Sequence, residues 1–231
     1  GLDILIECLR RASPSFQAKI VNVGSVGGIH AVKRGEADVA GIHLLDETSG
    51  EYNSPYLKRY GLLEQAAIVK GYVRQQGLIL AKGNPKGIQG IEDLLTKDVT
   101  FINRNRGSGT RILFDLHLKR IADERLMTIE ELISGIRGYE NEVKSHSAIA
   151  TAVLHGKADA GLGIRTVAER SGLDFVLIAE EHYDFLVLKG RLEKEGVKKL
   201  LDTLRSDEFR IELKGQTPGL IPSEETGLLL N

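Results

Sequence analysis

The sequence predicts an α/β protein of two similar lobes with mostly parallel sheets, and three observations lead to this prediction. Strand-like and helix-like segments alternate along most of the chain, a pattern typical of βαβ units. A short segment occurs in both halves, at 31–38 and again at 152–159. The length of 231 residues suits one large domain or two small ones, at about 150 residues per domain.

Each element is justified by its local pattern. Strands are expected where short apolar or β-branched runs occur, and helices where apolar residues recur every three or four positions, as in Ile112, Leu113 and Leu116. In chain order the expected elements are a helix at 2–11, a strand at 19–23, a helix at 29–33, strands at 37–42, 67–81 and 99–102, helices at 111–121 and 148–154, strands at 159–164, 175–178 and 185–188, and helices at 192–204 and 207–213.

The repeat links the two halves of the chain. Ala31-Val32-Lys33-Arg34-Gly35-Glu36-Ala37-Asp38 matches residues 152–159 at Ala, Val, Gly, Ala and Asp. Each copy predicts the end of a helix, a glycine in left-handed geometry and the start of a strand. Such junctions can look alike by chance. The alternative is two similar α/β lobes that face a shared cleft.

Composition excludes several classes of protein. With 31 Lys+Arg against 32 Asp+Glu, the formal net charge is −1, which argues against a protein that binds nucleic acid or a membrane through a basic face. The hydrophobic share of 42% and the charged share of 27% are typical of a globular protein with a core. Cys8 is the single cysteine, which excludes a disulfide framework and a Cys-based zinc site. The six histidines have no metal-ligand spacing, so no metal site is predicted.

Glycine is enriched, with 26 residues, and many of the glycines fall in turns that precede a helix. Three such turns, rich in glycine or hydroxyl groups, are Gly24-Ser25-Val26-Gly27-Gly28, Arg106-Gly107-Ser108-Gly109-Thr110 and Ser145-His146-Ser147-Ala148. Free backbone N–H groups and hydroxyls at a helix start, together with the helix dipole, favour an anion. The three turns therefore predict anion-binding positions.

The distribution of acids supports this reading. Other helix starts carry carboxylates, as in Thr128 followed by Glu130 and Glu131, Thr166 followed by Glu169, Ser206 followed by Asp207 and Glu208, and Ile91 followed by Glu92 and Asp93. The three glycine and hydroxyl turns carry none. Simple helix capping by Ser25, Ser108 or Ser145 is the alternative.

No catalytic residues are predicted. The second turn lacks the ending of a P-loop, no dinucleotide fingerprint follows a strand, and Ser108 is not in a nucleophile elbow. The basic residues Arg104 and Arg111 lie beside this turn. Arg74 lies within a strand-like run, where it faces either solvent or a cleft. His30, His43 and His146 are candidate hydrogen-bond donors near the cleft.

Ordered blocks along nearly the whole chain resemble a known family. They include Gly35-Glu36-Ala37-Asp38-Val39-Ala40-Gly41-Ile42-His43, Gly50-Glu51-Tyr52-Asn53, Arg74-Gln75-Gln76-Gly77-Leu78, Gly83-Asn84-Pro85, Gly107-Ser108-Gly109-Thr110-Arg111, Gly138-Tyr139-Glu140-Asn141-Glu142, Ser145-His146-Ser147-Ala148 and Gly156-Lys157-Ala158-Asp159-Ala160-Gly161. These blocks are similar to the periplasmic-binding-protein-like domain of molybdenum-cofactor biosynthesis proteins and molybdate-responsive regulators.

The resemblance implies a type II periplasmic-binding-protein fold of two lobes joined by two crossing strands. Lobe 1 would comprise 1–73 plus 186–231 and lack the family's first strand, and lobe 2 would comprise 74–185. An oxyanion would lie in the cleft between the lobes. By position, its ligands would be Ser25, Gly27, Gly28, Arg74, Ser108, Gly109, Thr110, Arg111, His146, Ser147 and Ala148.

The expected function is therefore to bind a small oxyanion, molybdate or tungstate first, as a sensor or delivery domain that closes around it. No cofactor beyond this ligand is expected. Expected partners are the oxyanion and a fused or partner molybdenum-cofactor or DNA-binding domain, with no contact to nucleic acid or membrane by this domain itself. The unpaired Cys8 favours the cytoplasm. Two alternatives remain open: an enzyme on the same fold that acts on a phosphorylated substrate, and a regulatory effector domain for an organic anion.

Overall fold

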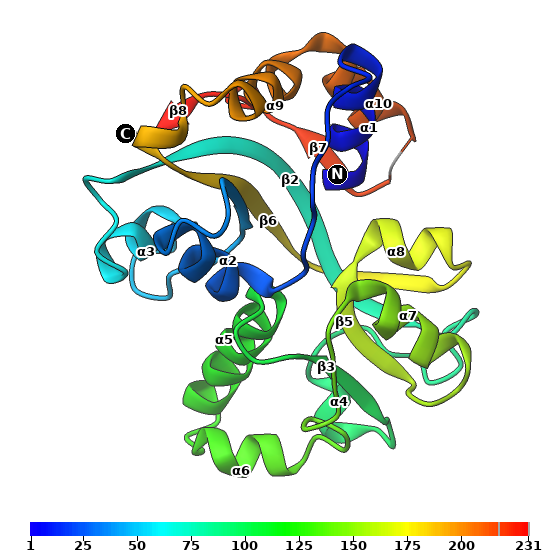
Figure 1. Ribbon diagram of the computed structural model, residues 1–231. Coiled ribbons are helices and arrows are strands. Elements are labelled where there is room, and N and C mark those ends of the chain that lie inside the picture. The colour runs from blue at the N-terminus through cyan, green and yellow to red at the C-terminus, as the bar shows by residue number, and fades with distance from the viewer. Residues whose placement is uncertain (217, 231) are drawn as a thin grey trace. The chain divides into compact units, whose positions relative to one another are not determined.

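The computed structural model describes residues 1–216 and 218–230, which form an α/β fold of two compact units (Figure 1). Unit 1 comprises Gly1–Arg74 and the segment from Glu181 onward, and unit 2 comprises Gln75–Glu180. The two-lobed α/β fold is thus as predicted. The chain passes between the units after residues 74 and 180, whereas the sequence placed these passages after 73 and 185. Residues 181–185 belong to unit 1 because side chains such as Asp184 bind within it.

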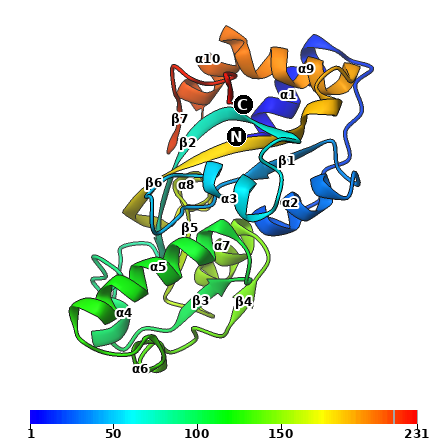
Figure 2. The same ribbon diagram turned by 90° about the vertical axis from the view of Figure 1, so that its left-hand side faces the viewer.

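Unit 1 is built around the outer parts of two long strands. Its elements are α1 (Leu2–Ala12), α2 (Gly24–Lys33), β1 (Val39–Ile42), α3 (Ser54–Arg59), the first part of β2 (Ala66–Leu80), the last part of β6 (Asp174–Leu188), a 3₁₀ turn (Lys189–Arg191), α9 (Glu195–Arg205), α10 (Asp207–Gln216), β7 (Leu220–Pro222) and β8 (Leu229–Leu230). Helices α1, α9 and α10 contact one another and form one group in both views (Figure 2).

The core of unit 1 follows from helical spacing. Leu5, Ile6 and Leu9 recur on one face of α1 and are buried there against Val69 of β2 and Phe185 of β6. Apolar residues of α9 and α10 complete the same core. A buried apolar side chain of this size contributes about 1.5–3 kcal/mol, so this cluster holds the helices on the sheet.

Unit 2 has a sheet with cores on both faces. Its elements are the last part of β2, α4 (Asp93–Thr96), β3 (Phe101–Arg104), α5 (Gly109–Glu124), α6 (Ile129–Ser134), β4 (Glu142–Val143), α7 (His146–Leu154), β5 (Ala160–Ile164), α8 (Arg165–Arg170) and the first part of β6. Leu78 and Leu80 belong to the core under α5 and α6, whereas Ile79 between them belongs to the core under α7 and α8. This alternation is the two-residue period of a strand buried on both sides.

The sheet is mixed rather than mostly parallel. β1 pairs antiparallel with β6, and β2 pairs antiparallel with β5, β7 and β8. β3 pairs parallel with β4 and β5. The alternation of strands and helices indicated parallel pairing, but β1 and β6 come together from distant parts of the sequence, and no local pattern specifies their direction.

The repeat has the predicted geometry in both units. Gly35 and Gly156 follow α2 and α7 with φ of 72° and 65°, the left-handed region that glycine adopts without steric cost. The next residue in each copy returns a hydrogen bond to the helix, from Glu36 N–H to Ala31 O and from Lys157 N–H to Ala152 O, both at 2.9 Å. A strand then begins. The two units therefore share a local helix–Gly–strand junction.

Two expected strands differ from the structure. Residues 19–23 form no strand, and Val21 is 61% exposed. β-branched residues favour a strand only where the backbone finds a partner to pair with. The strands expected at 175–178 and 185–188 are parts of one continuous strand, β6. Within the described residues, no helix is both long enough and apolar enough to cross a membrane.

Candidate functional site

The start of α5 in unit 2 is a capped turn. After β3 the chain reverses at Gly107, whose φ is 81°, and Ser108 is the N-cap of the helix. The Ser108 Oγ accepts the backbone N–H of Arg111 at 3.2 Å, so its own hydrogen remains to be donated. The N–H groups of Gly109 and Thr110 lie in the first turn, where a helix offers no acceptor of its own.

Thr110 adds a second observation at this helix start. Its side chain is fully buried, with 0% of its surface exposed. Its Oγ1 makes no hydrogen bond with any of the residues that the structure describes. A buried hydroxyl normally has a partner, because leaving it unsatisfied costs about 1–3 kcal/mol. Thr110 is therefore suited to contact a ligand atom at the start of α5.

The start of α7 is capped in the same way as the start of α5, by a serine side chain. Ser145 is the N-cap, and its Oγ accepts the N–H of Ala148 at 3.1 Å. The Ala148 N–H thus already has an acceptor in Ser145, and the ligand contact of Ala148 stays a prediction. His146 and Ser147 occupy the first turn. Ser145 is a hydroxyl that the list of predicted ligands omitted, although its position before an acid-free helix could have identified it.

The starts of α5 and α7 lie side by side in unit 2. They follow β3 and β4, which pair in parallel with Asn103 opposite Glu142. Asn105 N–H donates to the carbonyl of Val143 at 3.1 Å, and Arg104 Nη2 donates to the carbonyl of Lys144 at 3.1 Å. Because parallel strands end at the same edge of a sheet, the starts of α5 and α7 present their donors together.

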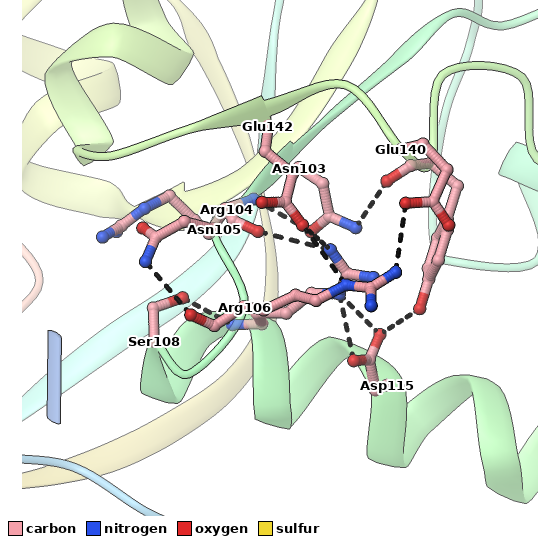
Figure 3. A network of polar contacts seen from close by, with 10 residues as sticks. Asn103, Arg104, Asn105, Arg106, Ser108, Asp115, Glu140 and Glu142 are labelled. Carbon is pink, nitrogen blue, oxygen red and sulfur yellow. Dashed lines mark hydrogen bonds and ion pairs between the residues drawn. The ribbon is translucent and has the colours of Figure 1, made fainter. Parts of the chain in front are cut away.

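The Arg111 side chain pairs with carboxylates of unit 2, and Asp115 and Glu142 are labelled in the polar network of Figure 3. Its Nε contacts both oxygens of Asp115 at 2.9 and 3.0 Å, and its Nη1 contacts Glu142 at 2.9 Å. The guanidinium also lies 4.2 Å from the centre of the Tyr139 ring. Ser108 therefore accepts the Arg111 N–H, and Asp115 and Glu142 compensate the charge of the guanidinium. The contact of Arg111 with an anion stays a prediction.

Burial sets the protonation of the groups around Arg111. It raises the pKa of Asp115 above its usual value, although Tyr139 and Arg111 act in the opposite direction. Burial and the contact with Asp115 raise the pKa of Tyr139 to about 12. The phenol is therefore protonated at neutral pH and donates its hydrogen bond to Asp115 Oδ1, at 2.8 Å.

A shallow cavity of about 590 Å³ lies beside this network in unit 2. Ile112 and Ile133 supply apolar lining, while Asp115, Glu130 and Glu140 supply carboxylates, and Arg106 and Arg111 supply the cations. The carboxylates outnumber the cations. This lining disfavours an anion, so we do not place the candidate anion site in the cavity.

In unit 1 the predicted turn forms the start of α2. Ser25 is buried, and its Oγ accepts the backbone N–H of His43 at 3.2 Å. Gly27 and Gly28 lie inside the helix, where the helix's own carbonyls accept their N–H groups. A Cβ on Gly28 would lie 3.0 Å from the Cβ of Ala40. Gly28 therefore allows α2 to pack closely on β1. The contact of Gly27 and Gly28 with a ligand stays a prediction.

Arg74 is buried in unit 1 and is paired. Its guanidinium forms an ion pair with Glu181 and lies 4.3 Å from the centre of the Tyr183 ring. The second oxygen of Glu181 contacts His43 Nδ1 at 2.9 Å. The charge of Arg74 is thus compensated within unit 1, and its predicted role as a ligand stays a prediction. Nothing in the local sequence around Glu181 marks it as the partner, because it lies more than a hundred residues away.

The predicted distribution of acids holds with one exception. The first turns of α2, α5 and α7 carry none, whereas those of α4, α6 and α10 do. The first turn of α8 also lacks acids, since the helix begins at Arg165 and Glu169 follows that turn. α6 has a full capping box between Thr128 and Glu131. In the described part of the chain, no three His, Cys, Asp or Glu residues gather in a way that could hold a metal ion.

Comparisons with known proteins identify the family. The model of the PBP superfamily domain matches residues 6–205. The chain belongs to the PBP (periplasmic-binding-protein) superfamily. It is 35% identical over 213 residues to the uncharacterized protein YvgK of Bacillus subtilis (strain 168), a match that covers 92% of this chain and 66% of YvgK. The chain thus spans a little under two thirds of the length of YvgK.

Solved structures agree with the PBP fold. A putative phosphate ABC transporter substrate-binding protein from Clostridium perfringens, with bound phosphate, superposes with a TM-score of 0.70 at 16% identity, covering 96% of this chain and 94% of that one. The protein PEB3 with bound L-phospholactate gives a TM-score of 0.61 at 18% identity, covering 96% and 95%. At such identities the likeness shows the fold alone.

Proposed function

We propose that this PBP-superfamily chain binds a small tetrahedral oxyanion through uncharged donors at helix starts, with molybdate and tungstate as the leading ligands. The observation that carries the proposal is Thr110, a fully buried hydroxyl without a partner among the described residues, in the acid-free first turn of α5. An oxyanion oxygen would accept the hydrogen bond that this hydroxyl can donate.

The surrounding donors support the proposal. Ser108 and Ser145 each use an Oγ lone pair to cap a helix, and each keeps an O–H to donate. The first-turn N–H groups of α5 and α7 add backbone donors, and each helix start carries about half a positive charge from the dipole. These groups neutralise an anion without a formal cation, which is consistent with a net charge of −1 and with the pairing of the buried Arg74 and Arg111 with carboxylates.

The absence of acids in the first turns of α5 and α7 bears on the choice of anion. Phosphate carries a proton at neutral pH and needs an acceptor for it, whereas molybdate, tungstate and sulfate are fully deprotonated and need only donors. This argument favours the second group. Phosphate stays in the comparison, because a phosphate-bound protein shares the fold and the Thr110 hydroxyl is able to accept as well as donate.

Calorimetric titration with molybdate, tungstate, sulfate, phosphate and a panel of organic acids tests the proposal. We expect Thr110→Val to weaken oxyanion binding by about 1–3 kcal/mol, the effect of losing one buried hydrogen bond. The free energy of unfolding of the ligand-free protein should stay the same or rise, because the substitution replaces an unsatisfied hydroxyl with a methyl group of similar size. If the Thr110 hydroxyl had a structural role only, its removal would not weaken oxyanion binding while leaving the free energy of unfolding unchanged or higher.

The matched control is Thr96→Val, which removes the hydroxyl of an exposed helical threonine of unit 2 that bonds to Glu92 O. Its affinity should equal that of the unchanged protein. Equal affinity of Thr110→Val would remove the start of α5 from the site. Failure of every inorganic oxyanion to bind at millimolar concentration would refute the function, and binding of organic acids alone would favour the effector-domain alternative.

The role in a longer protein is also proposed. YvgK extends beyond the length that this chain covers, and a ligand-binding unit of this superfamily is suited to serve as a sensor or delivery domain beside a further domain. A molybdenum-cofactor or DNA-binding domain is the partner we propose. Oxyanion-dependent binding between this chain and such a domain, measured with and without molybdate, would test it.

A further inference from the structure

Arg111 joins the start of one helix of unit 2 to the strand that leads into the other. The residue is 3% exposed, and its backbone N–H donates to the Oγ of Ser108, the N-cap of α5. Its Nη1 donates to the Oε1 of Glu142 in β4, at 2.9 Å. β4 ends at Val143, two residues before Ser145, the N-cap of α7. A single residue thus links the first turn of α5 to the segment that positions α7.

The Arg111 guanidinium is held in one orientation. Its Nε lies 2.9 and 3.0 Å from the two oxygens of Asp115, one turn further along α5, and its central carbon lies 4.2 Å from the centre of the Tyr139 ring. In Figure 3, Asp115 of α5 and Glu142 of β4 approach the network from opposite sides. Because a guanidinium is planar and its donors point in fixed directions, these contacts leave Arg111 little freedom to move relative to Glu142.

Other bonds join the two helix starts at the level of the strands. β3 pairs in parallel with β4, and Arg104 Nη2 donates to the carbonyl of Lys144. These bonds fix β4 beside the end of β3, but they do not involve a residue of α5. The contact between Arg111 and Glu142 carries the connection from β4 to the helix itself. The separation between the donors of the two helix starts therefore depends on this ion pair as well as on the strands.

Donors at a fixed separation distinguish anions by size. Tetrahedral oxyanions differ in this respect, because the metal–oxygen bonds of molybdate and tungstate are longer than the sulfur–oxygen bonds of sulfate. A binding site keeps such discrimination only when the residues behind its donors hold them within about 0.5 Å of the productive geometry. Donors that can shift accommodate both sizes, and they bind the preferred anion less tightly because they must be ordered when it binds.

We propose that the ion pair between Arg111 and Glu142 is the positioning element that fixes the spacing of the α5 and α7 donors, so that the site selects molybdate and tungstate over the smaller sulfate. This inference rests on the proposed oxyanion function, and every contact that it uses lies within unit 2. In this role the pair acts through the helix starts, by holding Ser108 and Thr110 at a set distance from Ser145.

Two glutamates of the same segment provide a matched test. Glu142→Ala removes a partner of Arg111, whereas Glu140→Ala removes an exposed carboxylate that pairs with the exposed Arg106. We expect Glu142→Ala to lower the molybdate affinity by about tenfold, the order of effect that loss of a residue supporting the ligands has in metal sites, and to lower the sulfate affinity by less. Glu140→Ala should bind both anions as the unchanged protein does. Calorimetric titration with each anion gives the two affinities.

The ratio of the molybdate affinity to the sulfate affinity is the readout, because a folding defect does not change it. Misfolded protein lowers the number of binding sites for both anions and leaves the two affinities of the folded protein as they are. Glu142→Gln, which keeps an acceptor for Arg111 without the charge, should have a ratio between those of Glu142→Ala and the unchanged protein. Adding Glu142→Ala to Arg111→Met should change the ratio no further, since both substitutions remove the same contact.

Four outcomes decide against the inference. Equal affinity ratios in Glu142→Ala and Glu140→Ala overturn it and leave the oxyanion function in place. A further fall of the ratio when Glu142→Ala is added to Arg111→Met does the same, because Glu142 would then act without Arg111. Equal affinity of the unchanged protein for molybdate and sulfate also overturns the inference alone. Failure of every oxyanion to bind overturns the function and this inference together.

Discussion

Arg74 in unit 1 and Arg111 in unit 2, two of the buried arginines, show how this chain compensates positive charge in its interior. Arg74 in unit 1 and Arg111 in unit 2 each lie over a tyrosine ring, at 4.3 and 4.2 Å, and each is paired with carboxylates. A buried guanidinium needs such compensation because removing it from water is costly. The charges of both guanidinium groups are therefore compensated by carboxylates of the protein itself.

The two clusters differ in the exposure of their carboxylates. The Glu181 side chain that pairs with Arg74 is 1% exposed, whereas those of Asp115 and Glu142 beside Arg111 are 41% and 29% exposed. Water can solvate the second pair of acids but not Glu181. The comparison indicates that the cluster around Arg74 depends on each of its members, and that the cluster around Arg111 tolerates the loss of one.

The largest difference between the two clusters should appear in the unfolding free energy when Arg74 and Arg111 are each replaced in turn. Arg74→Met removes the guanidinium that pairs with the buried Glu181 carboxylate, and we expect the free energy of unfolding to fall by about 3–5 kcal/mol. Arg111→Met leaves acids that water reaches, and a loss of about 1–2 kcal/mol is expected. Urea denaturation of both variants measures this. Equal losses in unfolding free energy would mean that the different exposure of the carboxylates has no effect on the two clusters.

The pH dependence of Asp115 should give a smaller effect. Its pKa is raised in the folded protein, so the folded state holds this proton more tightly than the unfolded chain does. Asp115 therefore lowers the unfolding free energy at pH values above its raised pKa, and this penalty fades as the pH falls toward the ordinary value of 3.8. Asp115→Asn removes the titration. Its stability relative to the unchanged protein should improve as the pH rises from about 4 to 7, and a constant difference would refute the assignment.

The smallest effect should come from Tyr139→Phe, which keeps the ring under Arg111 and removes the hydrogen bond to Asp115. We expect a loss of about 1 kcal/mol in unfolding free energy, the usual net contribution of one such bond. Denaturation at neutral pH is the measurement. An unchanged denaturation midpoint would mean that water replaces the Tyr139 phenol at the half-exposed Asp115 carboxylate. The difference in solvent access between this cluster and the one around Arg74 would then be larger than expected.

The features of the fold and of the site that the sequence predicted correctly are those formed by residues close together in the chain. The helix–Gly–strand repeat recurs with the same geometry in both units because a left-handed glycine and its hydrogen bonds depend on neighbouring residues alone. Ser108 caps α5, and no acid lies in that first turn, as the sequence indicated. Such features involve residues within one turn of each other.

Prediction failed where a residue's role depends on a distant partner. Residues 19–23 have the composition of a strand but form none. Arg111 follows a ligand-like turn, yet its charge is taken up by Asp115 and Glu142. In the same way, the run at 67–81 indicated a strand but not that Arg74 within it would meet Glu181, more than a hundred residues away.

Local sequence specifies the alternation of elements, the acid-free first turns of α5 and α7 and the hydroxyls that cap these helices, since capping and periodicity act within a few residues. Packing of distant segments sets the mixed direction of the sheet, the pairing of Arg74 and Arg111 with carboxylates, and the burial of Thr110 without a partner among the described residues. Burial and charge pairing depend on which distant side chains meet, and that is settled only when the chain packs.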